Sequence, residues 1–315
     1  MIQAAPAKVS RLIHTGQVIV DLVMQIDALP APGGDVLATN AGFEAGGGFN
    51  VMAAARRNHM RVVYAGGHGS GRFGDMARAA LEKEGVDIAA AQVAAQDTGL
   101  CVALVDTHAE RTFVSHMGAE SVLERSVLDT LEVTRDDIVY VSGYSLMLAD
   151  KAAVLVAWLE QLPVGTRVAF DPGPLVDSID AAVLGRVLAV VSIWTSNRAE
   201  ALRFAATDNL DAAFDFIGMR LRGAALTVVR DGARGCDLRV AGQRDHVPGF
   251  AVEAVDTNGA GDAHTGVFLA MLARGADMRT AATRANAAGA LAVTRYGPAT
   301  APDSTQIDVF LDSRG

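Results

Sequence analysis

The sequence predicts an α/β protein with a mostly parallel central sheet flanked by helices. Compact apolar runs, several of them rich in β-branched residues, alternate with stretches rich in Ala and Leu, and 50% of the 315 residues are hydrophobic. Apolar runs of this kind are typical of strands that are buried on both faces of a sheet. No linker rich in Pro, Ser or charge divides the chain, so we expect a single domain over residues 1–315.

The elements follow one another in a regular order along the chain. The runs predicted as strands are Val18–Val20, Val62–Tyr64, Ile138–Val141, Val168–Phe170, Val190–Trp194 and Leu226–Val229. The stretches predicted as helices are Val51–His59, Asp75–Glu84, Lys151–Gln161, Ala199–Ala206, Asp211–Arg222, Ala263–Arg274 and Met278–Val293. Alternation of this kind favours parallel strands that are joined by crossover helices.

Two segments depart from this alternation and carry polar residues at alternate positions. One lies around Asp35–Glu44, and the other runs from Leu100 to His116, with a hairpin turn expected at His108-Ala109-Glu110. Hairpins inserted into an α/β domain often form a lid over the site. We therefore expect a small β lid built from about residues 15–45 and 98–117, although an edge extension of the sheet would give the same pattern. Free strand edges also make a homodimer through the lid an expectation.

Composition excludes several classes of function. The formal net charge is −9 and basic clusters are absent, which argues against a nucleic-acid partner and against an anionic membrane surface. No long uncharged apolar run and no signal-like N-terminal segment is present. Cys101 and Cys236 lie in apolar surroundings without metal-binding or redox spacing. We expect two buried reduced thiols and a cytoplasmic protein.

The segment with the clearest chemistry is Val255-Asp256-Thr257-Asn258-Gly259-Ala260-Gly261-Asp262. It follows a strand-like run, Ala251–Val255, and precedes a helix, so its glycines lie at a predicted strand-to-helix junction. Glycines allow a tight turn there, and the N–H groups of a helix N-terminus attract an anion such as phosphate. Beside such a site, Asp262 is placed to accept a proton from a hydroxyl. An acid in a first helical turn can also simply complement the helix dipole.

This segment resembles the C-terminal signature of the PfkB carbohydrate kinase family, the ribokinase-like kinases, which usually reads D-T-x-G-A-G-D before an apolar helix. Every position matches, with Asn258 at the variable one. The resemblance extends over about residues 13–302. It implies a ribokinase-like fold and transfer of the γ-phosphoryl group of Mg·ATP to a hydroxyl of a small carbohydrate, with Asp262 as general base. It also implies that these residues donate backbone N–H groups to the developing charge: Gly259, Ala260 and Gly261.

Two further stretches resemble the acceptor-binding half of such a site. Residues 16–21 are similar to the first strand of the family, which ends in an acceptor-binding Asp, here Asp21. Residues 45–50 are similar to the family pattern G-G-x-x-x-N, and we prefer the alignment on Asn50. The resemblance therefore implies that Asp21, Gly46, Gly47 and Asn50 bind the acceptor. Taken alone, Asp21 could cap a turn and Asn50 could be a helix N-cap.

Other stretches resemble the nucleotide-binding half. Asn197 and Glu200 form an N-x-x-E motif for magnesium and phosphate, with Glu200 acting through metal-bound water. A capping box at a helix start is the structural alternative. Residues 227–235 resemble the strand and glycine turn under the nucleotide, and a later position resembles one beside the adenine. The nucleotide contacts implied in this way are Arg230, Gly232, Gly235 and Asn286.

The resemblance also implies a monovalent-cation site that would hold potassium. It would use backbone carbonyls from the loop 293–298, which contains Gly297, and from Asp256 and Asn258. One position departs from the family, because His264 stands where Phe is common. We expect His264 on the helix surface, although it could instead face the nucleotide or the substrate. Residues 66–75 match the first family signature only in part, so a structural turn is an equal interpretation.

Two other functions remain open from the sequence. A nucleoside kinase of the same fold would need an apolar wall for the base, which Phe49, Phe113, Tyr144 and Met117 could supply. A non-catalytic ligand sensor would usually lack the base, yet Asp262 is present. The sequence does not determine which sugar or nucleoside is the acceptor, or which of its hydroxyls reacts.

Overall fold

The computed structural model describes residues 10–107 and 110–314. Within them a large sheet is built from β1 (Arg11–His14), β4 (Arg61–Tyr64), β6 (Asp87–Ile88), β10 (Ile138–Ser142), β11 (Arg167–Asp171), β12 (Ile193–Asn197), β13 (Leu226–Arg230), β14 (Gly235–Val240) and β15 (Gln243–Pro248). Their order across the sheet is β15-β14-β13-β12-β11-β10-β1-β4-β6. The strands from β13 to β6 pair in parallel, whereas β14 and β15 add an antiparallel hairpin at one edge.

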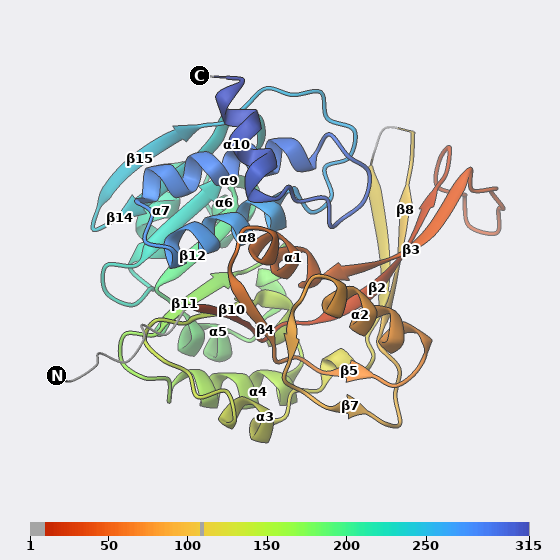
Figure 1. Cartoon of the computed structure of the whole chain (residues 1–315), viewed down its shortest axis with the longest axis horizontal. Coiled ribbons are helices and arrows are strands. Elements are labelled where there is room, and N and C mark those ends of the chain that lie inside the picture. The colour runs from red at the N-terminus through yellow and green to blue at the C-terminus, as the bar shows by residue number, and fades with distance from the viewer. Residues whose placement is uncertain (1–9, 108–109, 315) are drawn as a thin grey trace.

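Helices cover both faces of this sheet (Figure 1). One face packs against α1 (Phe49–Arg57), α2 (Arg72–Lys83), α8 (Ala260–Ala273) and α9 (Met278–Ala292). The other packs against α3 (Arg125–Asp129), α4 (Ala149–Leu159), α5 (Ala181–Leu188), α6 (Arg198–Phe204) and α7 (Leu210–Gly218). The helix α10 (Ser304–Asp312) lies on α9. Short 3-10 turns are η1 (Ala119–Ser121), η2 (Gly143–Leu146), η3 (Val176–Ser178) and η4 (Gly232–Arg234).

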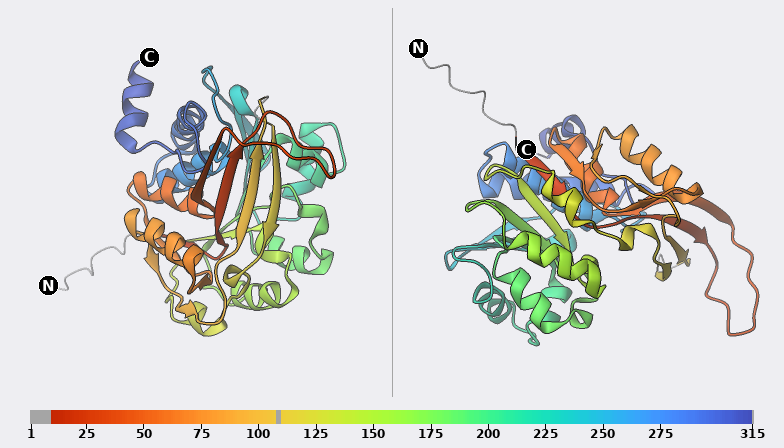
Figure 2. Two further views of the ribbon diagram at one scale, coloured as in Figure 1. Left: turned by 90° about the vertical axis from the view of Figure 1, so that its right-hand side faces the viewer. Right: turned by 90° about the horizontal axis from the view of Figure 1, so that it is seen from below.

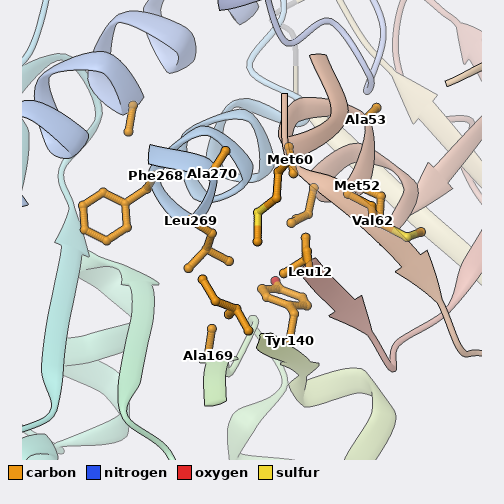
Figure 3. Close-up of a cluster of buried hydrophobic side chains, with 14 of the residues drawn as sticks. Leu12, Met52, Ala53, Met60, Val62, Tyr140, Ala169, Phe268, Leu269 and Ala270 are labelled. Carbon is orange, nitrogen blue, oxygen red and sulfur yellow. The ribbon is translucent and has the colours of Figure 1, made fainter. Parts of the chain in front are cut away.

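The core on the α1/α8 face holds these two helices against the centre of the sheet. Leu12, Val62 and Tyr140 project from β1, β4 and β10 toward side chains of α1 and α8 (Figure 3). Met52 of α1 and Leu269 of α8 are fully buried among them. Each such side chain contributes roughly 1.5–3 kcal/mol to stability through its burial. This packing determines where the N-termini of α1 and α8 meet.

A second sheet stands apart from the main body. It contains β2 (Val18–Gln25), β3 (Asn40–Gly47), β8 (Leu100–Val105) and β9 (Arg111–His116), in the order β3-β2-β8-β9. The loop between β2 and β3 projects away from the molecule (Figure 2). We call this four-stranded sheet the lid sheet. A separate pair is formed by β5 (His68–Gly69) and β7 (Gln92–Val93). Of the expected hairpin turn, His108 and Ala109 lie outside the described residues, while β8 and β9 pair on either side of it.

The predicted fold class is confirmed, and several assignments of individual elements are corrected. Val18–Val20 begins β2 of the lid sheet, and β1 is the strand that opens the central sheet. β1 was not predicted, because its apolar run contains only two residues, Leu12 and Ile13. Residues 251–255 are not a strand, because the N–H of Val255 bonds the carbonyl of Val293 at the end of α9. The helices α3, α5 and α10 and the β14–β15 hairpin were not predicted.

Two expectations from composition can be compared with the described part of the chain. Cys101 and Cys236 are both buried and unpaired, as predicted. Among the helices of residues 10–107 and 110–314, none is both long and apolar enough to cross a membrane.

Candidate active site

The carboxyl ends of three neighbouring parallel strands bring polar side chains to one edge of the main sheet. Asp171 ends β11, Asn197 ends β12 and Arg230 ends β13. The strand register places Asn197 directly beside Arg230. In open α/β sheets, ligands bind outside the carboxyl ends of the strands. A ligand site is therefore expected at this edge of the sheet.

The guanidinium of Arg230 connects these strand ends to helix α8. It donates hydrogen bonds to Asp171 Oδ2 at 3.1 Å, Thr195 Oγ1 at 2.9 Å and Thr265 Oγ1 at 2.6 Å. The Glu200 carboxylate lies 4.0 Å away. Arg230 is thus the positive centre of a group of carboxylates contributed by different elements.

Helix α8 begins at this group with an unusual turn. Gly259 is its N-cap and has φ of +71°, a left-handed conformation that favours glycine. A Cβ at this position would lie only 1.7 Å from the carbonyl oxygen of Pro298. The N–H groups of the first helical turn have no acceptor within the helix. Gly259, Ala260 and Gly261 therefore form a helix start suited to an anion.

Asp262 lies in the first turn of α8 beside Asn50 of α1. The Asn50 amide Nδ2 donates a hydrogen bond of 3.0 Å to Asp262 Oδ2. The two helices approach this closely because of Gly266, one turn further along α8, where a Cβ would lie 2.5 Å from the carbonyl oxygen of Val51. Asn50 is not the N-cap of α1, since Gly48 holds that position. The alternative interpretation of Asn50 as a cap is therefore wrong.

Burial raises the pKa of Asp262 to about 6. The nearby carboxylates of Asp171 and Glu200 raise this pKa further, whereas the Asn50 hydrogen bond and Arg230 lower it. A carboxyl group with this pKa is mostly ionised near neutral pH and still basic enough to accept a proton.

The predicted acceptor residues form a second acidic group next to Asp262. Asp21 of β2 is buried, and a Cβ on Gly46 would lie 2.0 Å from its Oδ2. Burial raises the pKa of Asp21 to about 7, and Glu44 and Asp262 raise it as well. Gly47 has φ of +62° and turns the chain from β3 into α1. Glycine at position 46 therefore leaves the carboxylate of Asp21 uncovered by a side chain.

A cavity of about 370 Å³ opens at the N-terminus of α8. It contains most of the predicted nucleotide residues, together with apolar side chains from the segment after β15 and from α9. The lining residues are Asn197, Arg230, Gly232, Ala233, Gly235, Phe250, Val252, Ala254, Thr257, Ala260, Gly261, His264, Asn286, Gly289, Ala290 and Val293. One end is thus polar and lies at the helix start, and the other end is apolar.

The position of His264 differs from the expectation. It is only 5% exposed. Burial lowers its pKa to about 3, so the ring is neutral. The prediction of a helix-surface histidine is wrong because α8 packs against both α1 and α9, which leaves little of its circumference in solvent.

Two predicted nucleotide residues also have structural roles. Asn197 and Glu200 form a capping box at the start of α6, with both hydrogen bonds at 2.8 Å. Glu200 is buried, and its pKa is raised by burial and by Asp171. The Asn286 amide donates to the carbonyl oxygens of Val247 and Pro248 at the end of β15. Asn286 therefore holds one wall of the cavity through its amide nitrogen.

The residues predicted for a cation site lie in the loop before α8 and in the loop 293–298 after α9. Asp256 Oδ1 accepts from the N–H of Asn258 at 2.7 Å, and Oδ2 accepts from the N–H of Gly297 at 3.0 Å. The carboxylate also forms an ion pair with Arg111 of β9. Arg111 donates a second hydrogen bond of 3.3 Å to Thr257 Oγ1. The lid sheet is thus tied to the loop that carries the helix start.

A wider hollow of about 740 Å³ lies nearby, on the outer side of α6 and the β14–β15 hairpin. Its positive side chains already have acidic partners. Arg198 and Arg234 pair with Asp231, and Arg244 pairs with Asp237. None of the predicted catalytic or acceptor residues lines it, so we place the site at the smaller cavity.

Two residues of this site were missed from the sequence. Asp171 follows the same rule as Asn197, a polar residue where a buried strand ends, and that signal would have found it. Arg111 had no such signal, since it was one polar residue in a strand with alternating polarity.

Comparisons with known proteins give a consistent result. The sequence matches the pfkB family of carbohydrate kinases over residues 10–305. The uncharacterized sugar kinase YegV of Escherichia coli strain K12 is 32% identical over 295 residues, which is 93% of this chain and 91% of that protein. The ATP-dependent ribose-1-phosphate kinase of Halopiger xanaduensis is 28% identical over 96% of this chain and 99% of that protein. The fructokinase of Vibrio cholerae O395, solved with fructose, ADP and calcium, superposes with a TM-score of 0.80 at 25% identity, over 96% of this chain and 99% of that one.

Proposed function

The chain belongs to the pfkB family of carbohydrate kinases, and from this premise we propose that it transfers the γ-phosphoryl group of Mg·ATP to a hydroxyl of a small neutral sugar. It is a phosphotransferase with an alcohol group as acceptor. The observation that carries the proposal is the 3.0 Å hydrogen bond between Asn50 and Asp262. This bond joins the acceptor half of the site to the half that holds the phosphates.

The nucleotide occupies the cavity of about 370 Å³ in this proposal. The apolar end, with Phe250 and Val252, suits a purine base, and the α8 N-terminus and Arg230 suit the phosphates. Gly232 and Gly235, both at positive φ, form the turn on which the nucleotide rests. The related Vibrio cholerae fructokinase was solved with ADP, which supports an adenine nucleotide as a ligand.

Magnesium fits the charge distribution around Arg230. Asp171, Glu200 and Asp262 place more negative charge there than one guanidinium neutralises, and Asp171 and Glu200 act electrostatically on each other and on Asp262. In the described part of the chain, no group of three or more His, Cys, Asp or Glu side chains could hold a metal ion. Glu200 would hold the ion through water, as Mg²⁺ commonly allows. When bound, the ion neutralises charge on the transferring phosphoryl group.

Asp262 accepts the proton of the attacking hydroxyl in this mechanism. Asn50 holds Oδ2, which leaves Oδ1 to face the acceptor. The N–H groups of Gly259, Ala260 and Gly261 then donate to the oxygens on which charge develops. Each of these groups is in place before the reaction, so little reorganisation is required.

The acceptor end of the site favours a neutral sugar over a sugar phosphate. The charged neighbours that raise the pKa of Asp21 are the carboxylates of Glu44 and Asp262. A phosphate dianion beside three carboxyl groups would be strongly repelled. Sugar hydroxyls, in contrast, can donate hydrogen bonds to Asp21 and Asn50.

The organisation of the chain in this proposal is one kinase domain over residues 1–315, with a lid from about 15–45 and 98–117. The lid is also the surface through which two copies would associate. Phe113 and Val114 on β9 are 51% and 65% exposed and point to opposite faces of the lid sheet, so each face would bring one apolar side chain to such a contact.

The test of the mechanism is the variant Asp262→Asn. We expect turnover to fall by about 10²-fold or more, because the amide cannot accept the proton, while ATP binding stays intact. Isothermal titration with ATP and a coupled ADP assay measure the two quantities. Glu253→Gln, which removes an exposed carboxylate on the segment before the site, serves as the matched control. Turnover near the wild-type value in Asp262→Asn would reject Asp262 as the base.

An acceptor panel tests the substrate class. It contains fructose, ribose, 2-keto-3-deoxygluconate, ribose 1-phosphate, adenosine and inosine, each with Mg·ATP. We expect turnover with a neutral sugar. Preference for a nucleoside would support the nucleoside kinase, preference for ribose 1-phosphate would overturn the neutral-acceptor argument, and ATP consumption with none of them would favour a non-catalytic sensor.

A further inference from the structure

The loop that precedes α8 receives a positive charge from the lid sheet. Arg111 of β9 pairs with Asp256, 145 residues further along the chain. The two side chains are only 12% and 11% exposed, so the pair is largely shielded from water. A carboxylate and a guanidinium removed from water in this way attract each other strongly.

Some of the oxygens near Asp256 that could hold a potassium ion are already engaged in hydrogen bonds. Both oxygens of the Asp256 carboxylate accept hydrogen bonds from N–H groups of Asn258 and Gly297. The carbonyl oxygen of Val293 accepts from the N–H groups of Val255 and Asp256, at 2.7 and 3.1 Å. A monovalent cation placed beside Asp256 would also be repelled by the guanidinium. With Arg111 in place, its charge therefore disfavours a potassium ion beside the Asp256 carboxylate.

Arg111 lies in acidic surroundings. It lines a cavity of about 340 Å³ between the lid sheet and the loop at Gly297. Glu44, Asp27 and Asp256 contribute carboxyl groups to this cavity, and Arg111 is the one basic side chain among the described residues that line it. Burial lowers the pKa of Arg111, but the guanidinium stays charged because it is so strongly basic.

We propose that the guanidinium of Arg111 takes the place of the monovalent cation and holds the Asp256 loop, and with it the α8 N-terminus, ready for phosphoryl transfer without potassium. This inference rests on the proposed kinase function. It deepens that function by assigning Arg111 as a positioning residue, because Arg111 acts through Asp256 and not on the substrate. Since Arg111 belongs to β9, the lid sheet and the helix start are coupled through one ion pair.

The experiment compares the wild-type chain with Arg111→Gln in potassium chloride and in choline chloride at equal ionic strength. We expect wild-type turnover to agree in the two salts within about twofold, since general screening is the same. Turnover of Arg111→Gln should fall by about tenfold or more in choline, because the loop before α8 loses the ion pair that holds it. Turnover of this variant should recover in potassium. Arg111→Lys, which keeps the charge, should need potassium less than Arg111→Gln.

A second readout does not depend on catalysis. The midpoint of thermal unfolding without substrates should be the same for the wild type in both salts. For Arg111→Gln it should be higher in potassium, because an ion that binds only the folded state stabilises it. Thr112→Ala, the exposed next residue on β9, is the matched control and should respond to neither salt.

Several results would overturn the proposal. Activation of the wild type by potassium would overturn it. So would an Arg111→Gln variant that, in choline chloride, turns over as fast as the wild type. An Arg111→Gln protein that is folded, inactive in both salts and without a potassium-dependent midpoint would also contradict it. If the wild type phosphorylates no acceptor, the kinase proposal fails, whereas the unfolding measurement still decides on the cation site.

Discussion

At the scale of single residues, the environment of Asp262 determines its chemistry. Burial is the largest cause of its raised pKa, and the carboxylates of Asp171 and Glu200 add to it. Asn50 and Arg230 act in the opposite direction. The balance leaves a carboxyl group with a pKa of about 6, closer to the working pH than that of an exposed Asp.

The pH dependence of turnover should report this pKa. A protonated Asp262 cannot accept the proton of the acceptor hydroxyl, so kcat should fall by about tenfold per pH unit below pH 6. Measurement of kcat at saturating substrates across this range checks the prediction. The control Glu253→Gln should show the same acidic limb. If kcat instead began to fall near the pKa of an exposed Asp, the buried environment assigned to Asp262 would be contradicted.

At the scale of elements, the site depends on how strands and helices end. β11, β12 and β13 bring Asp171, Asn197 and Arg230 to one edge, and α8 begins opposite them. Arg230 bonds residues of β11, β12 and α8 at once. It therefore fixes the relative positions of elements that the chain itself leaves unconnected.

Replacing this arginine should change the acidity of the site. Arg230 lowers the pKa of Asp262, so Arg230→Met should raise that pKa and move the acidic limb of kcat to higher pH. The shift should be about one pH unit, in addition to weaker ATP binding. Arg239→Met, on β14 and paired with Asp215, removes an arginine outside the site as a control. An unchanged limb in Arg230→Met would show that the guanidinium does not act on the base.

At the scale of the whole molecule, the buried acid Asp21 lowers the free energy of unfolding at high pH. The raised pKa of Asp21 means that the folded state binds a proton more tightly than the unfolded state. The stabilisation from this group is fully present below the unfolded pKa near 4 and is lost as the pH rises through about 7. At pH 8 the folded chain therefore keeps an ionised carboxylate in an unfavourable place.

Asp21→Asn should consequently stabilise the ligand-free protein at high pH. We expect the free energy of unfolding to rise by roughly 2–4 kcal/mol at pH 8, and the gain to disappear at about pH 4. Urea unfolding at the two pH values measures the change. Asp35→Asn, an exposed acid on the projecting loop, should leave the stability unchanged at both. A loss of stability in Asp21→Asn at pH 8 would contradict the burial argument.

The sequence by itself determined the fold class and predicted the helix start at which the proposed phosphate site lies. Alternating apolar and helical stretches predict a parallel α/β sheet, because hydrophobic periodicity is a local property of the chain. The segment 256–262 predicts an anion-binding helix start with an acid in its first turn, and α8 begins there with Gly259 at positive φ. The N-x-x-E motif likewise appears at the start of α6, where Asn197 and Glu200 cap the helix.

Only the tertiary structure decided which distant residues meet. Asn50 and Asp262 are 212 positions apart and Arg111 and Asp256 are 145 apart, so no local spacing links either pair. Their contacts depend on which helix faces pack together, as Gly266 allows for α1 and α8, and on where the lid sheet lies. The same packing buried His264, which one helix alone would have left at its surface. Local patterns depend on neighbours a few residues away, whereas these contacts depend on how whole elements pack against one another.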